Sequence, residues 1–284
     1  MNENKTNINW YPGHMAKTKR EIKEQIDLVD VVVLVLDARV PRSSYVKDID
    51  EFTNNKDKII VFSKYDLCDK ERTLMWETYY KDHGYTVLKS TLESSSIKNE
   101  LIEAVSKSLE KINQKRKEKG LLPKKARVMI VGSSNVGKST LINKIANRKA
   151  ATTGNIPGVT KNISTIKIND KIDLLDTPGV LWPKFDSEEE ALNLAAMSII
   201  KEEVVPLDKV AIHIMLKLNQ KYKPILKKEL GLDSFNLDDL EEEYETISKY
   251  KNLPKVGGEV DYDKINLLII NLIKNEQIKY ITFD

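Results

Sequence analysis

Short apolar runs, most of them rich in β-branched residues, recur along the first two thirds of the chain, at 31–36, 58–62, 85–88, 127–131, 164–168 and 171–175. Runs of this length are typical of strands, and the most continuous ones suit strands buried on both faces of a parallel sheet. Between them, apolar residues at helical spacing predict helices at 16–29, 101–112 and 141–146. The pattern therefore predicts an α/β, doubly wound sheet.

From about residue 187 the spacing of apolar residues becomes purely helical. Helices are expected at 191–199, 210–222, 237–247 and 262–273. We therefore expect two domains. Residues 1–186 form the α/β domain together with an N-terminal arm, and residues 187–284 form a small all-α domain.

The composition narrows the class of protein. The chain has 284 residues, 40% of them hydrophobic, which is enough for a sizeable core. Its N-terminus is polar, and no apolar run approaches the roughly 20 residues of a membrane span. The single cysteine, Cys68, excludes a disulfide framework and a zinc ribbon. A soluble, cytoplasmic protein without a membrane partner is expected.

The net charge of +3 hides an asymmetry between the two halves of the chain. Residues 1–185 carry 33 basic and 23 acidic side chains, whereas residues 186–284 carry 13 and 20. A basic first half suits a nucleotide or nucleic-acid partner, although charge alone supports only non-specific attraction.

A phosphate-binding motif stands in the middle of the chain. The apolar run at 127–131 leads into G-S-S-N-V-G-K-S-T, residues 132–140, which fits the P-loop pattern G-x-x-x-x-G-K-[ST] between a strand and a helix. Lys138 is expected to reach the terminal phosphates, and the Ser139 hydroxyl is expected to bind Mg²⁺. The expected nucleotide contacts here are Gly132, Asn135, Val136, Gly137, Lys138, Ser139 and Thr140.

Two later segments complete a phosphate and magnesium site. Asp176-Thr177-Pro178-Gly179 follows a predicted strand, so that Asp176 can support Mg²⁺ and the Gly179 N–H can sense the terminal phosphate. Thr160 lies in a turn-rich loop between the P-loop and this motif, where it can close over Mg²⁺. The helical domain follows this motif directly. We therefore expect the conformational effect of hydrolysis to reach the helical domain through a short connection.

A base-reading motif precedes the P-loop. Ser63-Lys64-Tyr65-Asp66 resembles N-K-x-D of GTPases, in which the carboxylate accepts two hydrogen bonds from guanine. Adenine lacks that pair of donors and would leave the carboxylate unpaired, so the site discriminates between the bases. Ser90 and Thr91, after the strand at 85–88, are the expected third contact with the base.

The order of these motifs is rotated relative to ordinary GTPases, in which the base motif comes last. This order resembles circularly permuted GTPases. W-Y-P-G-H-M at 10–15, D-A-R-V-P at 37–41, P-G-V-T at 157–160 and D-T-P-G-V-L-W-P-K at 176–184 are similar to the ribosome biogenesis GTPase A family. The resemblance covers essentially the whole chain.

The resemblance implies an enzyme that hydrolyses GTP slowly alone and faster on its target. That target is the large ribosomal subunit precursor with its rRNA, which the protein binds as a monomer in its GTP state and leaves after hydrolysis. The helical domain would help to grip the rRNA. Asn135 matches the asparagine of potassium-stimulated GTPases, so K⁺ is an expected activator beside Mg²⁺.

Two positions depart from common GTPase patterns. Val180 stands where many GTPases carry a glutamine that orients water, and the family resemblance assigns this role to His14. The alternative is that His14 only anchors the N-terminal turn.

Ser63 replaces the asparagine that is usual in the base motif. We therefore expect weaker nucleotide binding with the guanine preference retained, because Asp66 carries the discrimination.

Some alternatives stay open at this point. A small-subunit assembly GTPase is disfavoured, because those relatives carry an N-terminal β-barrel or a zinc site. In this chain the first clear strand begins too early to leave room for a barrel, and a single cysteine does not suit a zinc site. A GTP-regulated RNA-binding protein with little hydrolysis is disfavoured by Lys138, Ser139 and Asp176.

Two groups of basic residues allow two interpretations each. The basic segments 115–119 and 124–127 are either a solvated linker or a contact with RNA phosphates. Lysines between 209 and 228 are either a local basic patch or a solvated helix face.

Overall fold

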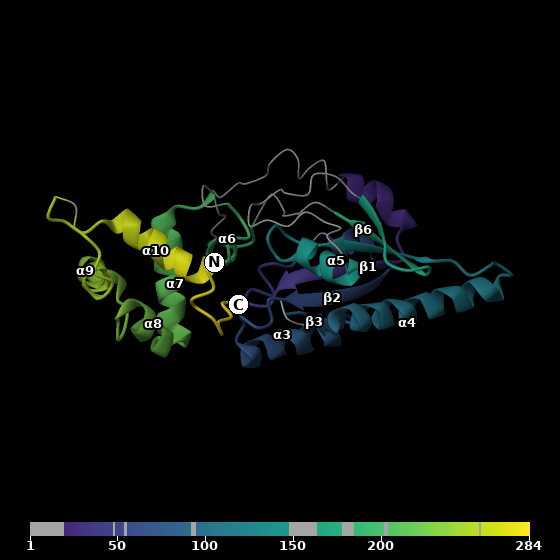
Figure 1. The fold of residues 1–284 in the computed structure, drawn as a ribbon, viewed down its shortest axis with the longest axis horizontal. Coiled ribbons are helices and arrows are strands. Elements are labelled where there is room, and N and C mark those ends of the chain that lie inside the picture. The colour runs from purple at the N-terminus through teal and green to yellow at the C-terminus, as the bar shows by residue number, and fades with distance from the viewer. Residues whose placement is uncertain are drawn as a thin grey trace, which may run out of the picture.

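The computed structural model has an α/β domain followed by a helical domain (Figure 1). It describes residues 20–47, 49–53, 56–91, 95–147, 164–177, 185–201, 204–255 and 257–284. Of Ser164 and Asp176 it describes the backbone alone.

Six strands form one sheet in the spatial order β3-β2-β1-β4-β6-β5. Their bounds are Val31–Asp37 (β1), Asp57–Ser63 (β2), Thr86–Lys89 (β3), Ala126–Val131 (β4), Ser164–Lys167 (β5) and Ile172–Asp176 (β6). Neighbouring strands are parallel except for β5, which runs antiparallel to β6. Every residue of β1 is buried, as expected of a central strand covered on both faces.

The sheet has a separate apolar core on each face, and β1 contributes to both by alternation. Val31, Val33 and Val35 point into the core that includes residues of α4 (Ile97–Glu118) and α5 (Lys138–Ala146). Val32, Leu34 and Leu36 point into the other core, which includes α2 (Ile49–Thr53) and Tyr80 of α3 (Lys70–Asp82). Residues 20–25 are helical and lead into a 3-10 turn, Ile26–Leu28 (η1). The predicted doubly wound architecture is confirmed.

The helical domain is built around α7. Its helices are α6 (Glu188–Ala196), α7 (Leu207–Lys221), α8 (Lys223–Leu230), α9 (Leu240–Tyr250) and α10 (Tyr262–Lys274), with a 3-10 turn, η3 (Leu237–Asp239), before α9. One face of α7 is buried through Val210, Ile214 and Leu218, and α10 packs against it with Ile269 and Ile273. No helix among the described residues is long and apolar enough to span a membrane.

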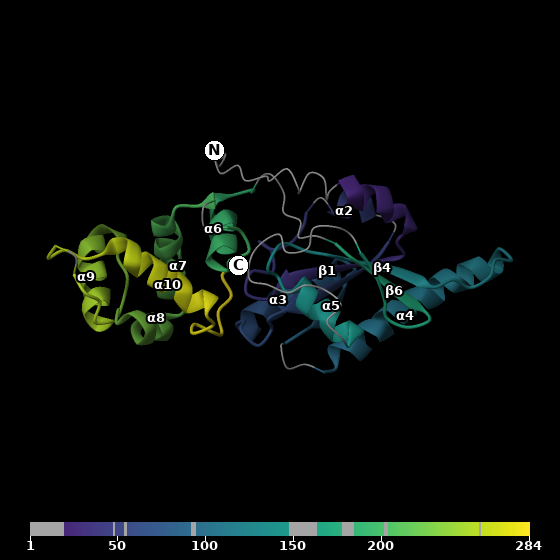
Figure 2. The same cartoon turned by 45° about the horizontal axis from the view of Figure 1, so that its top comes forward.

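The C-terminal segment, residues 279–284, returns to the α/β domain and lies between the two domains (Figure 2). The Tyr280 N–H donates to the Leu67 carbonyl at 2.7 Å, and the Phe283 N–H donates to the Arg39 carbonyl at 2.9 Å. The Asp284 carboxylate accepts from the backbone N–H groups of Arg42 and Ser43, at 2.7 and 2.9 Å. The helical domain is therefore attached to the loops that follow β1 and β2 as well as to the end of the sheet.

Candidate nucleotide-binding site

The P-loop lies between the end of β4 and the start of α5, as the motif predicts. A Cβ on Gly132 would lie 2.5 Å from the Val35 carbonyl oxygen, so only glycine permits this close approach to β1. Gly137 has φ +97°, a left-handed conformation that favours glycine and that turns the chain into α5. These two positions explain why the loop needs its glycines.

Lys138 lies in the first turn of α5 and is buried. Its Nζ donates to the Ser133 carbonyl at 2.7 Å, so the ammonium group is held within the loop. Ser139 and Thr140 follow in the same turn and are partly buried. A helix N-terminus with a lysine and successive N–H groups fits the phosphates of a nucleotide, and the Ser139 hydroxyl is a hard oxygen ligand that fits Mg²⁺.

Ser63, at the end of β2, contacts the P-loop directly. Its hydroxyl lies within hydrogen-bonding distance of two carbonyl oxygens, that of Leu36 at 2.9 Å and that of Val136. A hydroxyl has one proton, so it can donate to only one of them at a time. The serine therefore braces the loop, but with one donor where an asparagine amide would have two.

Asp66 has the environment that a guanine-reading carboxylate needs. Its Oδ1 is buried and has no hydrogen-bond partner among the residues that the structure describes. A buried acceptor without a partner costs free energy, and the N1–H and exocyclic amine of guanine are the donors that would satisfy the carboxylate. The geometry thus fits guanine.

The Ser90–Thr91 segment lies beside the base motif, as expected. The Ser90 N–H donates to the Phe62 carbonyl at 2.7 Å, and the Tyr65 N–H donates to the Ser90 carbonyl at 3.2 Å. Lys144 of α5 donates to the Thr91 carbonyl, which ties this segment to the P-loop helix. The structure therefore brings together the base motif, the segment expected to be its third contact with the base, and the phosphate loop.

A buried ion network of Asp37, Arg39 and Lys64 joins the two motifs. Lys64 is expected from the sequence as a nucleotide contact of the base motif, and Asp37 and Arg39 only as part of the motif at 37–41; the contacts among the three are not predicted. Asp37, at the end of β1, accepts from Arg39 Nε and Nη2 at 3.0 and 2.8 Å. Lys64 Nζ lies 3.0 Å from the same carboxylate and donates to the Asn135 carbonyl of the P-loop at 3.0 Å. Arg39 and Lys64 hold the pKa of Asp37 well below its usual value despite complete burial. The feature of the sequence that could have indicated this network is an aspartate at the end of a buried strand, where α/β sheets place ligands.

Asn135, the residue expected near K⁺, links the P-loop to the helical domain. Its backbone is left-handed, with φ 55°, and its Nδ2 donates to the Ser198 carbonyl beyond α6 at 2.7 Å. The amide oxygen is the group that would meet a cation.

Several expected site residues belong to segments outside the described ranges. His14, Thr160, Gly179 and Val180 lie outside the described residues, and so does the side chain of Asp176. The strand that carries Asp176 ends beside β4, on the same edge of the sheet as the P-loop. The buried Thr177 hydroxyl donates to the Ile130 carbonyl at 2.7 Å, which fixes the start of this motif against β4.

Most lysines on α7 and α8 are engaged with acids of the helical domain. Lys209, Lys217, Lys227 and Lys228 form ion pairs with Glu188, Glu189, Asp233 and Glu229 respectively. Lys217 and Lys221 also donate to the Phe283 carbonyl, at 2.8 and 3.1 Å. The local basic patch considered from the sequence is thus largely neutralised in this domain.

Known proteins match this chain over nearly its whole length. "Ribosome biogenesis GTPase A" of Priestia megaterium is 37% identical over 278 residues, covering 98% of this chain and 96% of that protein. The chain belongs to the ribosome biogenesis GTPase A family. The protein of the same name from Thermotoga maritima is 28% identical, covering 98% of this chain and 94% of that protein. The predicted GTPase activity, with its guanine nucleotide and Mg²⁺, is confirmed at the level of the family.

Family models and solved structures agree with this assignment. The model of the RsgA GTPase matches residues 17–186, and that of the 50S ribosome-binding GTPase matches residues 127–249. The GDP-bound structure of TM YlqF has a TM-score of 0.66 at 24% identity and covers 93% of this chain and 98% of that one. The GNP-bound YlqF from T. maritima has a TM-score of 0.65. The likeness to these structures confirms the circularly permuted fold.

Proposed function

We propose that this GTPase acts in late maturation of the large ribosomal subunit. It binds the precursor particle and its rRNA in the GTP state, as a cytoplasmic monomer, and is released after hydrolysis. The family supports the ribosomal role, and the match of residues 127–249 to the model of the 50S ribosome-binding GTPase favours the large subunit. The observation that carries the nucleotide part is the buried, unpartnered Oδ1 of Asp66 beside a P-loop braced by Ser63.

The hydrolytic step is mostly positioning and charge stabilisation. Water attacks the γ-phosphorus as the bond to the β–γ bridging oxygen breaks, and GDP and phosphate leave. The P-loop amides and Lys138 hold the phosphates, so the Lys138 ammonium exchanges its contact with Ser133 for phosphate oxygens. Ser139, Thr160 and, through water, Asp176 would hold Mg²⁺, which neutralises charge on the β- and γ-oxygens when it is bound.

We assign the orientation of the attacking water to His14 in the N-terminal arm, because Val180 offers no hydrogen bond. The precursor particle would stimulate hydrolysis by ordering this arm and the Thr160 loop, and K⁺ near Asn135 would add positive charge. The test is His14→Ala. We expect loss of particle-stimulated turnover with GTP binding intact, and survival of that turnover would refute the assignment.

The proposal as a whole is tested by GTP turnover and co-sedimentation with purified ribosomal subunits. We expect large subunits to raise turnover and to retain the protein with a non-hydrolysable GTP analogue but not with GDP. Lys138→Ala serves as the control that cannot hold the phosphates. Co-sedimentation with small subunits alone would overturn the proposal.

A further inference from the structure

The end of α4 and the segment after it project from the α/β domain. Leu109 is the last buried residue of α4, and the next buried residue is Ala126. We call residues 110–125 the basic arm. Its helical part, residues 110–118, is about 13 Å long at 1.5 Å per residue. In Figures 1 and 2 it extends past the sheet at the end of the molecule opposite the helical domain.

The basic arm is held in one conformation by its own hydrogen bonds. Asn113 Nδ2 donates to the Lys124 carbonyl at 3.3 Å, and the Lys124 N–H donates back to Asn113 Oδ1 at 3.0 Å. Arg116 Nε donates to the Leu122 carbonyl at 2.9 Å. Gly120, with φ +68°, allows the turn between the helix and the returning segment. The backbone positions that carry the charges of the arm are therefore held relative to one another.

The basic arm concentrates positive charge with little compensation from its own acids. It carries seven lysines and arginines and two glutamates. Lys111, Lys115, Lys117 and Lys119 form no ion pair with any residue in the described ranges, whereas Lys124 pairs with Asp30. This differs from the helical domain, where most of the lysines on α7 and α8 are paired with acids. The arm is thus the part of the described chain with the densest unpaired cations.

Helix stability does not explain this cluster. Cations in the last turn gain roughly 0.3–1 kcal/mol from the helix dipole, which accounts for Lys115 and Lys117. It does not account for Lys111, more than a turn earlier, or for Lys125 on the returning segment. Like charges four residues apart, as at Lys111, Lys115 and Lys119, cost a few tenths of a kcal/mol per pair. The arrangement suits a polyanionic partner better than an isolated helix.

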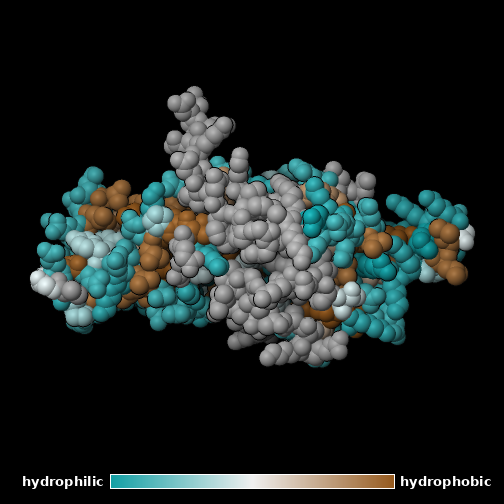
Figure 3. Space-filling model, turned by 90° about the horizontal axis from the view of Figure 1, so that it is seen from above, coloured by the Kyte–Doolittle hydropathy of each residue, from teal (hydrophilic) through white to brown (hydrophobic). Residues whose placement is uncertain are grey.

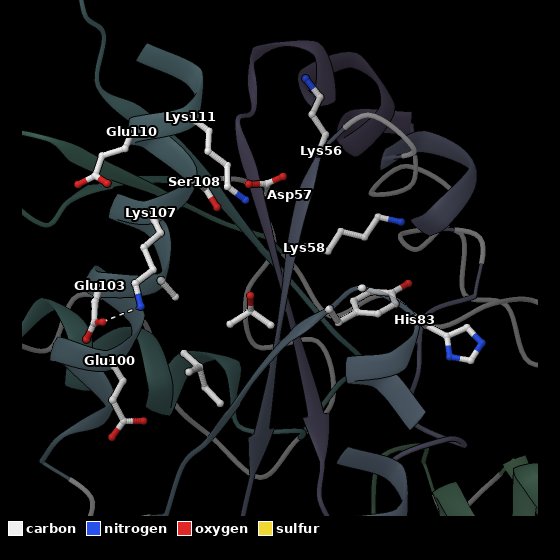
Figure 4. Close-up of a pocket in the computed structure, with 15 residues that line it drawn as sticks. Lys56, Asp57, Lys58, His83, Glu100, Glu103, Lys107, Ser108, Glu110 and Lys111 are labelled. Atoms are coloured by element: carbon white, nitrogen blue, oxygen red, sulfur yellow. Dashed lines mark ion pairs between the residues drawn. The ribbon is translucent and has the colours of Figure 1, made fainter. Parts of the chain in front are cut away.

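A hollow of about 770 Å³ at the base of the arm has a different character (Figure 4). It lies between α4 and the beginnings of β2 and β3, and its lining mixes lysines with Asp57, Glu100 and Glu103. Lys107 pairs with Glu103 there, and Lys58 pairs with Asp50. Glu110 and Lys111 at the start of the arm also line the hollow. A polyanion would meet acids there, so the cationic surface is the part of the arm beyond residue 111.

We infer that the basic arm is an RNA-binding surface, which contacts phosphates of a double-stranded segment at the end of the molecule opposite the helical domain. The inference relies on the proposed function only for the identity of the RNA as ribosomal. Figure 3 shows this end of the molecule as mostly hydrophilic with a small hydrophobic patch. Leu122, 82% exposed at the tip, offers an apolar contact to riboses in the shallow minor groove of RNA.

The test is binding of the full chain to an RNA duplex of about 20 base pairs, longer than the roughly 16 that a duplex-binding domain spans. The variant K115A/K117A/K119A removes three charges from the arm and keeps good helix formers. The matched control, K70A/K98A/K264A, removes three charges away from the arm that form no ion pair within the described ranges.

We expect the arm variant to lose roughly 10- to 100-fold in affinity at about 0.1 M salt, and the salt slope of log K to fall by about 2 to 3. The control variant should lose far less affinity for the duplex. Equal losses in the two variants would overturn the inference, and so would binding of the arm to anionic phospholipid vesicles in preference to the duplex. This assay needs no ribosome and no GTP, so its failure is distinct from failure of the proposed function.

Discussion

Asp37→Asn tests whether the buried ion network holds the two nucleotide motifs together. The Asp37 side chain is fully buried, and that of Arg39 is 4% exposed. Asparagine keeps the shape but supplies one oxygen and no charge, so the Arg39 guanidinium would remain buried beside Lys64 without a counter-charge. Removing one partner of a buried pair costs about 3–5 kcal/mol, which is a large part of the stability of an ordinary domain.

The consequence for binding follows from Lys64. In the native structure its ammonium group lies between Asp37 and the Asn135 carbonyl, and so it positions the P-loop. Repulsion from an uncompensated Arg39 would displace it, and we expect GDP affinity to fall roughly tenfold, equivalent to about 1.4 kcal/mol.

Urea unfolding and GDP calorimetry measure the two effects of Asp37→Asn. Glu245→Gln is the control, since Glu245 pairs with Lys249 and Lys255 at the surface and its loss should leave the unfolding midpoint unchanged. A loss of less than about 1 kcal/mol in Asp37→Asn would refute the argument that this network is a buried, coupled unit.

Three further outcomes are expected. Asp66→Asn should weaken GDP binding by roughly 10- to 100-fold, because a charged acceptor of two hydrogen bonds is lost, and calorimetry with GDP and ADP should show the guanine preference reduced. Ser63→Asn should raise GDP affinity several-fold, because its amide can donate to both Leu36 and Val136; unchanged affinity would show that one donor is sufficient. Burial lowers the pKa of His213 to about 4. The unfolded chain then takes up the proton first, so stability should decline from about pH 6.5 towards pH 4, by up to about 3 kcal/mol, a loss that His213→Gln should abolish in urea titrations.

The sequence predicted the sheet well because its strands are continuous apolar runs. It placed β1 within one residue of the observed bounds and the start of α10 at the observed residue. It missed α3, in which the residues buried against the domain include Thr73 and Glu77, so that apolar spacing gave no signal. It also underestimated α4, whose last turns bury nothing and are held by local hydrogen bonds.

The motifs predicted the chemistry of the site more completely than its architecture. The glycines of the P-loop are required by local backbone geometry and its lysine by the phosphates, and a short pattern encodes both. The network of Asp37, Arg39 and Lys64 joins β1, β2 and the P-loop, and its contacts depend on how the strands are ordered in space. No local pattern specifies that order, so the partners could not be assigned from the sequence.

The C-terminal segment changes the expected route between nucleotide and helical domain. The sequence indicated a single short connection behind the motif at 176–179. In the structure, the segment also bonds to Leu67, directly after Asp66, and to Arg39, the partner of Asp37. Asn135 of the P-loop contacts Ser198 as well. A shift of the base motif or of the P-loop would therefore break contacts to the helical domain. The helical domain is thus tied directly to the base motif and to the P-loop, and the expected connection behind the motif at 176–179 is one of several.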